Sequence, residues 1–240
     1  FTWLNRPDRD TRVDMLKAYL HQSLGSTVSL DVTPYEGSAE LPTVLMVSPP
    51  QAMDHWRIKD TEKDHKPYSE FNHTLLNGHG DLRLGDYLTA RLKEGEVKPD
   101  LTTMQAWSRF YPAGSTNGNL MLYELPVCPL WFDHEGEVYS VPPMFLPDLL
   151  TPINGLGADL ICYNILLAGE PWIKGEIRSN RGPWLDIPGT QVWSTGRDDW
   201  SSRPDCIGVG GDLWCEAGWG DFAIPNYASL AFRPGVPGNS

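Results

Sequence analysis

The sequence predicts an all-β fold, and two observations support this class. Glycine (23) and proline (21) together make up 44 of the 240 residues, a proportion typical of strands joined by many irregular loops. Short extended segments recur along most of the chain, whereas helical periodicity is confined to brief stretches. A chain of this length can bury a sizeable core without a second domain, so we expect a single domain over residues 1–240.

The first predicted element is a peripheral helix over residues 10–24, carried by an N-terminal extension of residues 1–26. Asp10 can cap its first turn, and Gly25 suits its end. Its apolar residues fall on one stripe, formed by Val13, Leu16 and Leu20.

Strands account for most of the other predicted elements. Residues 159–167 are apolar on both faces, which predicts a central strand. Eight or so of the predicted strands can make two packed antiparallel sheets. The predicted strands cover residues 28–32, 43–47, 71–76, 103–111, 119–127, 138–141, 159–167, 172–177, 191–194, 206–209, 212–216 and 227–232.

A second short helix is predicted over residues 81–92. Leu84, Leu88 and Leu92 recur at four-residue intervals, and Asp81 can accept hydrogen bonds from the free N–H groups of the first turn. An aromatic strand and a corner rich in glycine and asparagine, residues 115–119, follow it. This order of elements is a jelly-roll signature, so the predicted architecture is an eight-stranded antiparallel jelly-roll β-sandwich with short peripheral helices.

The segment between residues 142 and 159 predicts a long loop. It contains several prolines and many apolar residues but has no clean period. An exposed apolar loop of this kind typically packs on a neighbour or marks a binding edge.

The charge balance argues against nucleic-acid and membrane partners. The formal net charge is −12, and no run of lysine or arginine is long enough to neutralise phosphates, so we expect little direct RNA binding. Residues 57–66 mix both signs and predict a solvated surface loop or a subunit rim.

No apolar run approaches the roughly 20 residues that span a bilayer. With no leader evident, we expect a soluble chain, and Phe1 would suit cleavage from a longer precursor.

The four cysteines lie far apart and include no C-x-x-C pair, which argues against a zinc ribbon or a thioredoxin-type centre. We expect buried free thiols, with a disulfide framework as the alternative. These residues are Cys128, Cys162, Cys206 and Cys215.

The standard catalytic motifs are absent from the sequence, so we expect no enzyme activity, no catalytic residue, no cofactor and no metal. The glycine-rich segment 208–212 predicts a bend or bulge, and residues 133–137 predict a hairpin turn. His73 and His79, with Asp81 and Asp86 nearby, match no usual metal-ligand spacing, and we interpret them as loop and cap residues.

A cluster of tryptophans near the C-terminus supports an alternative function, a secreted carbohydrate-binding module or glycoside hydrolase. Aromatic side chains stack on sugar rings, and paired carboxylates cleave glycosides. The competing interpretation is that these aromatics fill the core or subunit interfaces. The residues concerned are Trp172, Trp184, Trp193, Trp200, Trp214 and Trp219, among Glu170, Glu176, Asp186, Asp198 and Asp199.

Three fragments resemble capsid proteins of picorna-like viruses. The first is the helix introduced by Gly80-Asp81 with Leu84, Leu88 and Arg91, followed by Trp107, Phe110-Tyr111 and Gly114. The second, Glu137 to Pro142, looks like the valine-proline entry to the long loop of that family. The third, Gly210 to Trp214, is similar to its Gly-Asp-Asp-Phe strand element.

The resemblance implies a non-enzymatic structural subunit of an icosahedral capsid in the virion, assembled in the host cytoplasm. The partners it implies are other capsid protein chains, with a host receptor at surface loops. The resemblance also makes Phe1 a protease-generated terminus. A viral spike or receptor-binding domain is a further alternative with the same loop-rich, acidic character.

Overall fold

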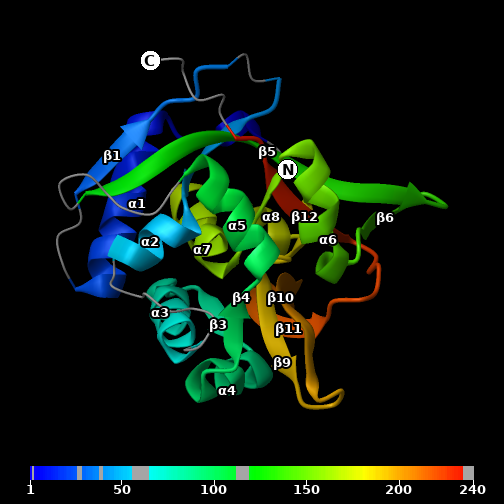
Figure 1. The fold of residues 1–240 in the computed structure, drawn as a ribbon. Helices are drawn as coiled ribbons and strands as arrows, with labels where there is room; N and C mark the ends of the chain where they lie inside the picture. The colour runs from blue at the N-terminus through cyan, green and yellow to red at the C-terminus, as the bar shows by residue number, and fades with distance from the viewer. Residues whose placement is uncertain (2, 26–28, 38–39, 56–64, 112–118, 235–240) are drawn as a thin grey trace.

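The chain is described by a computed structural model covering residues 1, 3–25, 29–37, 40–55, 65–111 and 119–234. In these residues twelve strands form one mixed sheet, joined and covered by short helices (Figure 1). The strands are β1 (Leu30–Thr33), β2 (Thr43–Val47), β3 (Leu82–Leu84), β4 (Val97–Pro99), β5 (Leu120–His134), β6 (Glu137–Ser140), β7 (Leu156–Gly157), β8 (Trp184–Asp186), β9 (Thr190–Ser194), β10 (Asp199–Val209), β11 (Asp212–Trp219) and β12 (Tyr227–Phe232).

The structure is strand-rich, as predicted, but its sheet combines parallel and antiparallel strand pairing. Its main path runs β1-β5-β12-β8-β10-β11-β3. The pairings β1–β5, β8–β12 and β3–β11 are parallel, and the other described pairings are antiparallel. The long strand β5 pairs with β1, β2, β6 and β12, so it connects the N-terminal part of the chain to the C-terminal strands.

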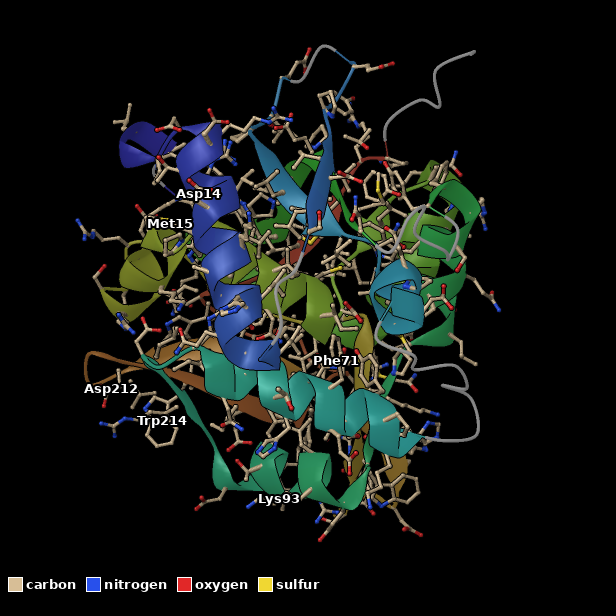
Figure 2. The ribbon with its side chains drawn as sticks, turned by 90° about the vertical axis from the view of Figure 1, so that its left-hand side faces the viewer. Asp14, Met15, Phe71, Lys93, Asp212 and Trp214 are labelled. Carbon is tan, nitrogen blue, oxygen red and sulfur yellow. The ribbon has the colours of Figure 1, made fainter. Side chains whose placement is uncertain are left out.

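Helices contribute as much to the core as the strands do. They are α1 (Arg9–Leu24), α2 (Pro49–His55), α3 (His65–Gly78), α4 (Asp86–Glu94), α5 (Leu101–Phe110), α6 (Leu146–Leu150), α7 (Leu160–Gly169) and α8 (Trp172–Arg178), with single 3₁₀ turns at η1 (Trp3–Asn5), η3 (Pro143–Phe145) and η4 (Thr151–Ile153). Figure 2 shows α1 crossing the line of α3, with α4 beneath them and Asp14 and Met15 on the outer side of α1.

The predicted central strand at 159–167 is instead helix α7, in the middle of the molecule (Figure 1). All ten of its residues are buried. A helix enclosed on every side is apolar all round, so it shows no 3.6-residue period and resembles a buried strand in sequence. Asp159 caps it by accepting a hydrogen bond from the backbone N–H of Cys162 at 2.9 Å.

Three other strand predictions are wrong, because these segments are helices in the structure. Residues 71–76 lie in α3, residues 103–110 lie in α5, and residues 172–177 lie in α8. In α5 the buried face is spaced at three and four residues, and Asp100 accepts from the Thr103 N–H as a cap. The buried residues of that face are Thr103, Ala106 and Trp107.

The helix predicted over 81–92 is present but begins later. Leu82–Leu84 instead form β3, which pairs in parallel with β11, and α4 starts after Gly85. Leu88 and Leu92 are buried as predicted, whereas Leu84 belongs to the strand. Asp81 does not cap a helix; its carboxylate binds Lys174 and Arg178.

The N-terminal helix α1 is confirmed, with Asp8 rather than Asp10 as its cap. The Asp8 carboxylate accepts a hydrogen bond from the Thr11 N–H at 3.0 Å. Gly25 ends the helix at φ +65°, as predicted. Leu16 and Leu20 lie in the same buried cluster as α7, so the helix is built into the core.

Several strand and turn predictions are confirmed. The strands at 43–47 and 227–232 match β2 and β12 at both ends, and β5, β6, β9, β10 and β11 cover the other predicted C-terminal strands. The hairpin at 133–137 joins β5 to β6, with Gly136 at φ +83°. The bend or bulge predicted at 208–212 is instead a hairpin turn, in which Gly210 and Gly211, at φ +59° and +89°, join β10 to β11.

The segment at 142–159 folds into η3, α6, η4 and β7 rather than an irregular loop. The predicted corner at 115–119 lies outside the described residues except for Asn119, and residues 57–64 of the charged segment, together with Val28 and Gly114, also lie outside them. Cys162, Cys206 and Cys215 are buried free thiols as predicted, and Cys128 is a half-buried free thiol.

Candidate functional site

A hollow of about 570 Å³ lies between two tryptophans from different parts of the sheet. Trp131 belongs to the β5–β6 hairpin and is 52% exposed, and Trp184 is the first residue of β8. Small-molecule sites are typically concave, aromatic-lined and of about 300–1,000 Å³. The remaining lining residues are Phe1, Val138, Asn180, Arg181, Gly182, Pro183 and Asn226.

Backbone hydrogen bonds join the walls of this hollow, which we call the Trp131–Trp184 hollow. The Trp184 N–H donates to the Asn226 carbonyl at 2.8 Å, and the Asn226 N–H donates to the Val138 carbonyl at 2.6 Å. These bonds connect β8, the start of β12 and the β5–β6 hairpin. The two tryptophan-bearing walls are therefore held together by main-chain contacts rather than by side chains alone.

The indole of Trp184 is oriented from two sides. Its Nε1–H donates to Asn180 Oδ1 at 3.0 Å, and its ring packs edge-on against Tyr227, with centroids 5.3 Å apart and planes at 88°. Asn180 has φ +52°, a left-handed conformation that asparagine tolerates better than most residues. The ring is thus held in one orientation at the hollow.

The polar lining is neutral apart from one guanidinium. Asn180 and Asn226 are exposed and carry amide groups, while Arg181 is exposed and uses its Nε to donate to Ser179 Oγ at 3.0 Å. Gly182 allows close packing against Phe1, because a Cβ there would lie 2.6 Å from the phenyl ring. This set of amides, guanidinium and indoles suits a hydroxyl-bearing ligand with an apolar ring face.

Two buried carboxyl groups, those of Asp186 and Asp205, lie close to Trp184 in the sheet but do not line the hollow. Asp186 lies two residues after Trp184 on β8, and it pairs directly with Asp205 on β10. They are 3% and 8% exposed. Side chains at directly opposed positions of antiparallel strands point to the same face, with Cβ atoms about 4.5–5.5 Å apart.

Burial is the main cause of the unusual protonation of this pair. Burial, with a smaller contribution from the charge of Asp205, raises the pKa of Asp186 to about 7. Burial also raises the pKa of Asp205 to about 7, with Glu216 as the second cause. The hydroxyls of Ser140 and Tyr227 offset part of these effects, at Asp186 and Asp205 respectively.

The structure separates the C-terminal tryptophans into several environments. Trp172 packs against Trp3, Trp193 packs against Trp200, and Trp214 lies under Arg83. None of these four predicted tryptophans lines the hollow with Trp184. Trp219 lines a different hollow. The tryptophans that are close in sequence therefore do not form a single aromatic site in this structure.

The predicted acids are also dispersed. Glu170 is buried and bound by Arg6 and Arg12, and Glu176 is buried in α8. Asp198, at φ +58°, lies at the turn between β9 and β10, and Asp199 accepts a hydrogen bond from the Ser201 N–H. Of the predicted acids, Asp186 alone faces another buried carboxyl across a strand pairing within the described residues.

His79 and Asp81 share a contact with Lys174 Nζ, whereas His73 lies within α3 and Asp86 begins α4. The described residues contain no group of three or more histidine, cysteine, aspartate or glutamate side chains suited to a metal ion. His79 is buried, its ring stacks on Tyr19 at 4.4 Å, and burial lowers its pKa to about 3. Lys174 Nζ lies 3.1 Å from its Nδ1.

Two residues of the site were missed in the sequence. The hairpin turn predicted at 133–137 lies next to Trp131 but does not indicate that Trp131 lines a hollow, because its partner Trp184 lies 53 residues further on. Asp205 precedes the predicted strand 206–209, which in fact begins at Asp199. A predicted strand that began at Asp199 would include Asp205. No local sequence signal, however, indicates that Asp205 pairs with Asp186.

No helix in the described ranges combines the length and apolar character that a membrane crossing requires. Comparison with protein-family models, with curated proteins and with solved structures finds no match to this chain.

Proposed function

We propose that this chain binds carbohydrate through the Trp131–Trp184 hollow. The observation that carries the proposal is the presence of two tryptophans on walls joined by backbone hydrogen bonds, in a hollow whose lining also contains amide and guanidinium groups. Indole faces pack against the apolar faces of sugar rings, and neutral amides and a guanidinium bond to ring hydroxyls.

The same geometry favours binding without cleavage. A glycosidase needs its two carboxyl groups on either side of the scissile bond and open to the substrate. Asp186 and Asp205 are nearly completely buried, and neither lines the hollow. We therefore propose a carbohydrate-binding protein rather than a glycoside hydrolase.

The test is a glycan array followed by calorimetric titration of each positive glycan. We expect Trp131→Ala to remove one binding event per chain, because it deletes an exposed platform with little cost to folding. Phe132→Ala is the matched control, since Phe132 is an exposed aromatic on the same hairpin that does not line the hollow. Equal binding by Trp131→Ala and the native protein would overturn the proposal, as would an array without a positive glycan.

Cleavage is tested separately. We expect a bound oligosaccharide to remain intact after prolonged incubation with the protein, as judged by chromatography. Shorter products that disappear in Asp186→Asn would instead assign a hydrolase.

A second candidate function is a structural subunit of a virus-like capsid, favoured by an exposed apolar surface. Phe145, Leu149 and Ile153 are 50%, 56% and 72% exposed. They lie in the segment predicted to pack on a neighbour, and such a surface suits contact with a second copy or a related chain.

The finer architecture of this candidate is the eight-stranded antiparallel jelly roll. The three parallel pairings and the helical conformation of Trp107 and Phe110 differ from that pattern, so the support for the capsid candidate comes from the apolar surface and the sequence fragments. Electron microscopy of the purified protein tests it: shells or rings support it, and dispersed monomers at high concentration contradict it.

A further inference from the structure

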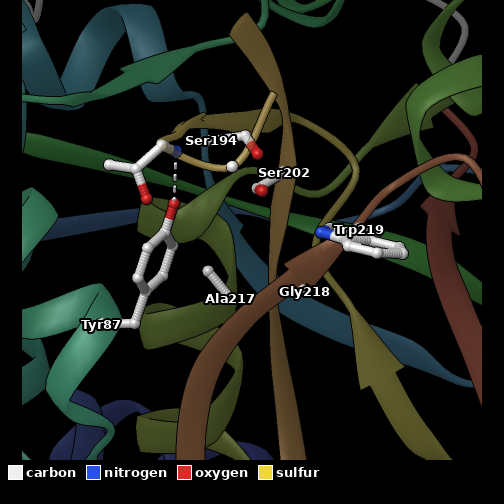
Figure 3. A pocket seen from close by; sticks show the side chains of 8 residues that line it. Tyr87, Ser194, Ser202, Ala217, Gly218 and Trp219 are labelled. Carbon is white, nitrogen blue, oxygen red and sulfur yellow. Dashed lines mark hydrogen bonds between the residues drawn. The ribbon is translucent and has the colours of Figure 1, made fainter. Parts of the chain in front are cut away.

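A second hollow, of about 380 Å³, is built from residues that take no part in the Trp131–Trp184 hollow. Figure 3 shows Tyr87 of α4 and Trp219 of β11 on opposite sides of it, with Ser202 of β10 between them. We call it the Tyr87–Trp219 hollow. Its other lining residues are Ser194, Thr195, Gly196, Ala217 and Gly218.

Tyr87 is fixed as one wall. Its hydroxyl donates to the Trp193 carbonyl at 2.6 Å. The same hydroxyl accepts from the Thr195 N–H at 3.2 Å (Figure 3). Both bonds connect α4 to the end of β9 and the turn that follows. Because this hydroxyl already serves as donor and acceptor within the protein, the side chain offers its ring rather than its oxygen to a ligand.

Trp219 forms the opposite wall and is 56% exposed. The Arg197 guanidinium lies 4.7 Å from the centroid of its indole ring and is itself held by Asp221 at 2.6 Å. This cation–π contact orients the indole at the protein surface. Because Arg197 covers one side of the indole, the remaining exposed surface of Trp219 is the flat apolar surface that the hollow offers to a ligand.

The chemistry of the lining defines the ligand class. No charged side chain lines the hollow; its polar groups are the hydroxyls of Ser194, Thr195 and Ser202, and the small residues Gly196, Ala217 and Gly218 leave the space open. The nearby Arg197 guanidinium, which stacks on Trp219, is already paired with Asp221, so the hollow offers little counter-charge to a phosphate or carboxylate ligand. A neutral ring with hydroxyls on its edge and an apolar face would match both the walls and the floor.

From this geometry we infer that the Tyr87–Trp219 hollow is a second saccharide subsite, which takes one neutral sugar ring against Trp219. This inference rests on the proposed carbohydrate-binding function and extends it from one binding site to two. The native protein then binds two short saccharides per chain.

The experiment is a calorimetric titration of the intact chain with cellotriose, xylotriose and mannotriose. We expect a stoichiometry of two for the native protein, and of one for both Trp219→Ala and Trp131→Ala. Trp214→Ala is the matched control, because Trp214 lies on the same strand but lines neither hollow. It should keep a stoichiometry of two.

A second variant guards against misfolding. Gly196→Leu should fill the Tyr87–Trp219 hollow without deleting a contact, since a Cβ at Gly196 meets no atom within 4 Å. It should also reduce the stoichiometry to one, with an unchanged melting temperature.

The outcomes separate the two proposals. A native stoichiometry of one that is lost only in Trp131→Ala overturns the second subsite and supports the proposed function. A stoichiometry of one that is lost only in Trp219→Ala overturns the assignment of the Trp131–Trp184 hollow and supports this one. The absence of binding by all three trisaccharides overturns the second subsite, whereas the glycan array decides the proposed function.

Discussion

Gly85 and Glu216 lie next to each other, and the absence of a side chain at Gly85 leaves room for the Glu216 carboxylate that caps α4. A Cβ on Gly85 would lie 1.6 Å from Glu216 Oε2. Gly85 is the N-cap of α4 and has no side chain to bond the first turn. Glu216, from β11, supplies the missing acceptor: its Oε1 bonds the Leu88 N–H at 2.9 Å. A helix cap is thus provided from a strand 131 residues further along the chain (216 − 85).

Gly85→Ala should therefore destabilise the fold, although alanine is the better helix former. The new methyl group displaces the Glu216 carboxylate, which is also held by the Ala217 N–H at 2.9 Å, so the cap is lost at a cost of about 1–2 kcal/mol. Urea unfolding measures the change. Gly80→Ala is the control, because a Cβ there meets nothing within 4 Å. A loss in Gly85→Ala no larger than in the control would contradict the relationship.

The Asp186–Asp205 pair should make stability fall as pH rises. Both carboxyls have a folded-state pKa of about 7, above the unfolded value of about 4. The folded chain therefore binds more protons than the unfolded chain between these limits. The stability that the pair contributes is complete below about pH 4 and is lost as pH rises through 7, by about 1.4 kcal/mol for each unit of pKa difference.

Asp186→Asn should remove part of this dependence and be more stable than the native protein above pH 7. Urea unfolding at pH 5, 6, 7 and 8 tests this expectation, with the exposed Asp14→Asn as the control. A native free energy of unfolding that rises steadily from pH 5 to pH 8 in parallel with that of Asp186→Asn would show that the pair is ionised without penalty.

Glu170, which binds Arg6 and Arg12 of the N-terminal segment, should contribute strongly to the stability of the fold. Its buried carboxylate accepts hydrogen bonds from Arg6, from Arg12 at 2.8 Å and from Trp172 Nε1 at 2.8 Å. Glu170→Ala leaves the buried guanidinium of Arg12 without its partner, and we expect a loss of about 3–5 kcal/mol.

Thermal and urea unfolding of Glu170→Ala measure this loss. Asp212→Ala is the control, because the Arg83–Asp212 ion pair is exposed on both sides and should contribute less than about 1 kcal/mol. Similar losses in the two variants would argue against a structural role of the Glu170 network.

Tyr68 should link α3 to the cap of α7. Its hydroxyl donates to Asp159 Oδ2 at 3.0 Å and lies 2.8 Å from Thr190 Oγ1, and all three residues are buried. Tyr68→Phe leaves these buried groups short of a partner, so we expect a loss of about 1–3 kcal/mol. Hydrogen exchange should show faster opening of α7 in the variant, and unchanged exchange would contradict the link.

Several elements were predictable because their signals are local. Residues 43–47 and 227–232 are short apolar runs with clear boundaries, and the sequence assigned both as strands. The turn at Gly136 needs left-handed backbone, which glycine adopts without strain. The end of α1 at Gly25 follows the same rule.

The failures share one physical cause, which is burial on more than one side. Helix α7 has no polar face because strands and helices enclose it, and an apolar run without a period does not distinguish helix from strand. In α5, aromatic and β-branched residues suggested a strand, but packing on one face determined a helix.

The turn at Gly136, the end of α1 at Gly25 and the apolar strands β2 and β12 follow from the sequence alone, because they depend on single residues and their neighbours. Which distant residues meet depends on the tertiary structure. The register of β8 with β10 places Asp186 opposite Asp205, β11 brings Glu216 to Gly85, and the β5–β6 hairpin brings Trp131 to Trp184. These contacts depend on strand pairing across long separations, which local patterns do not encode.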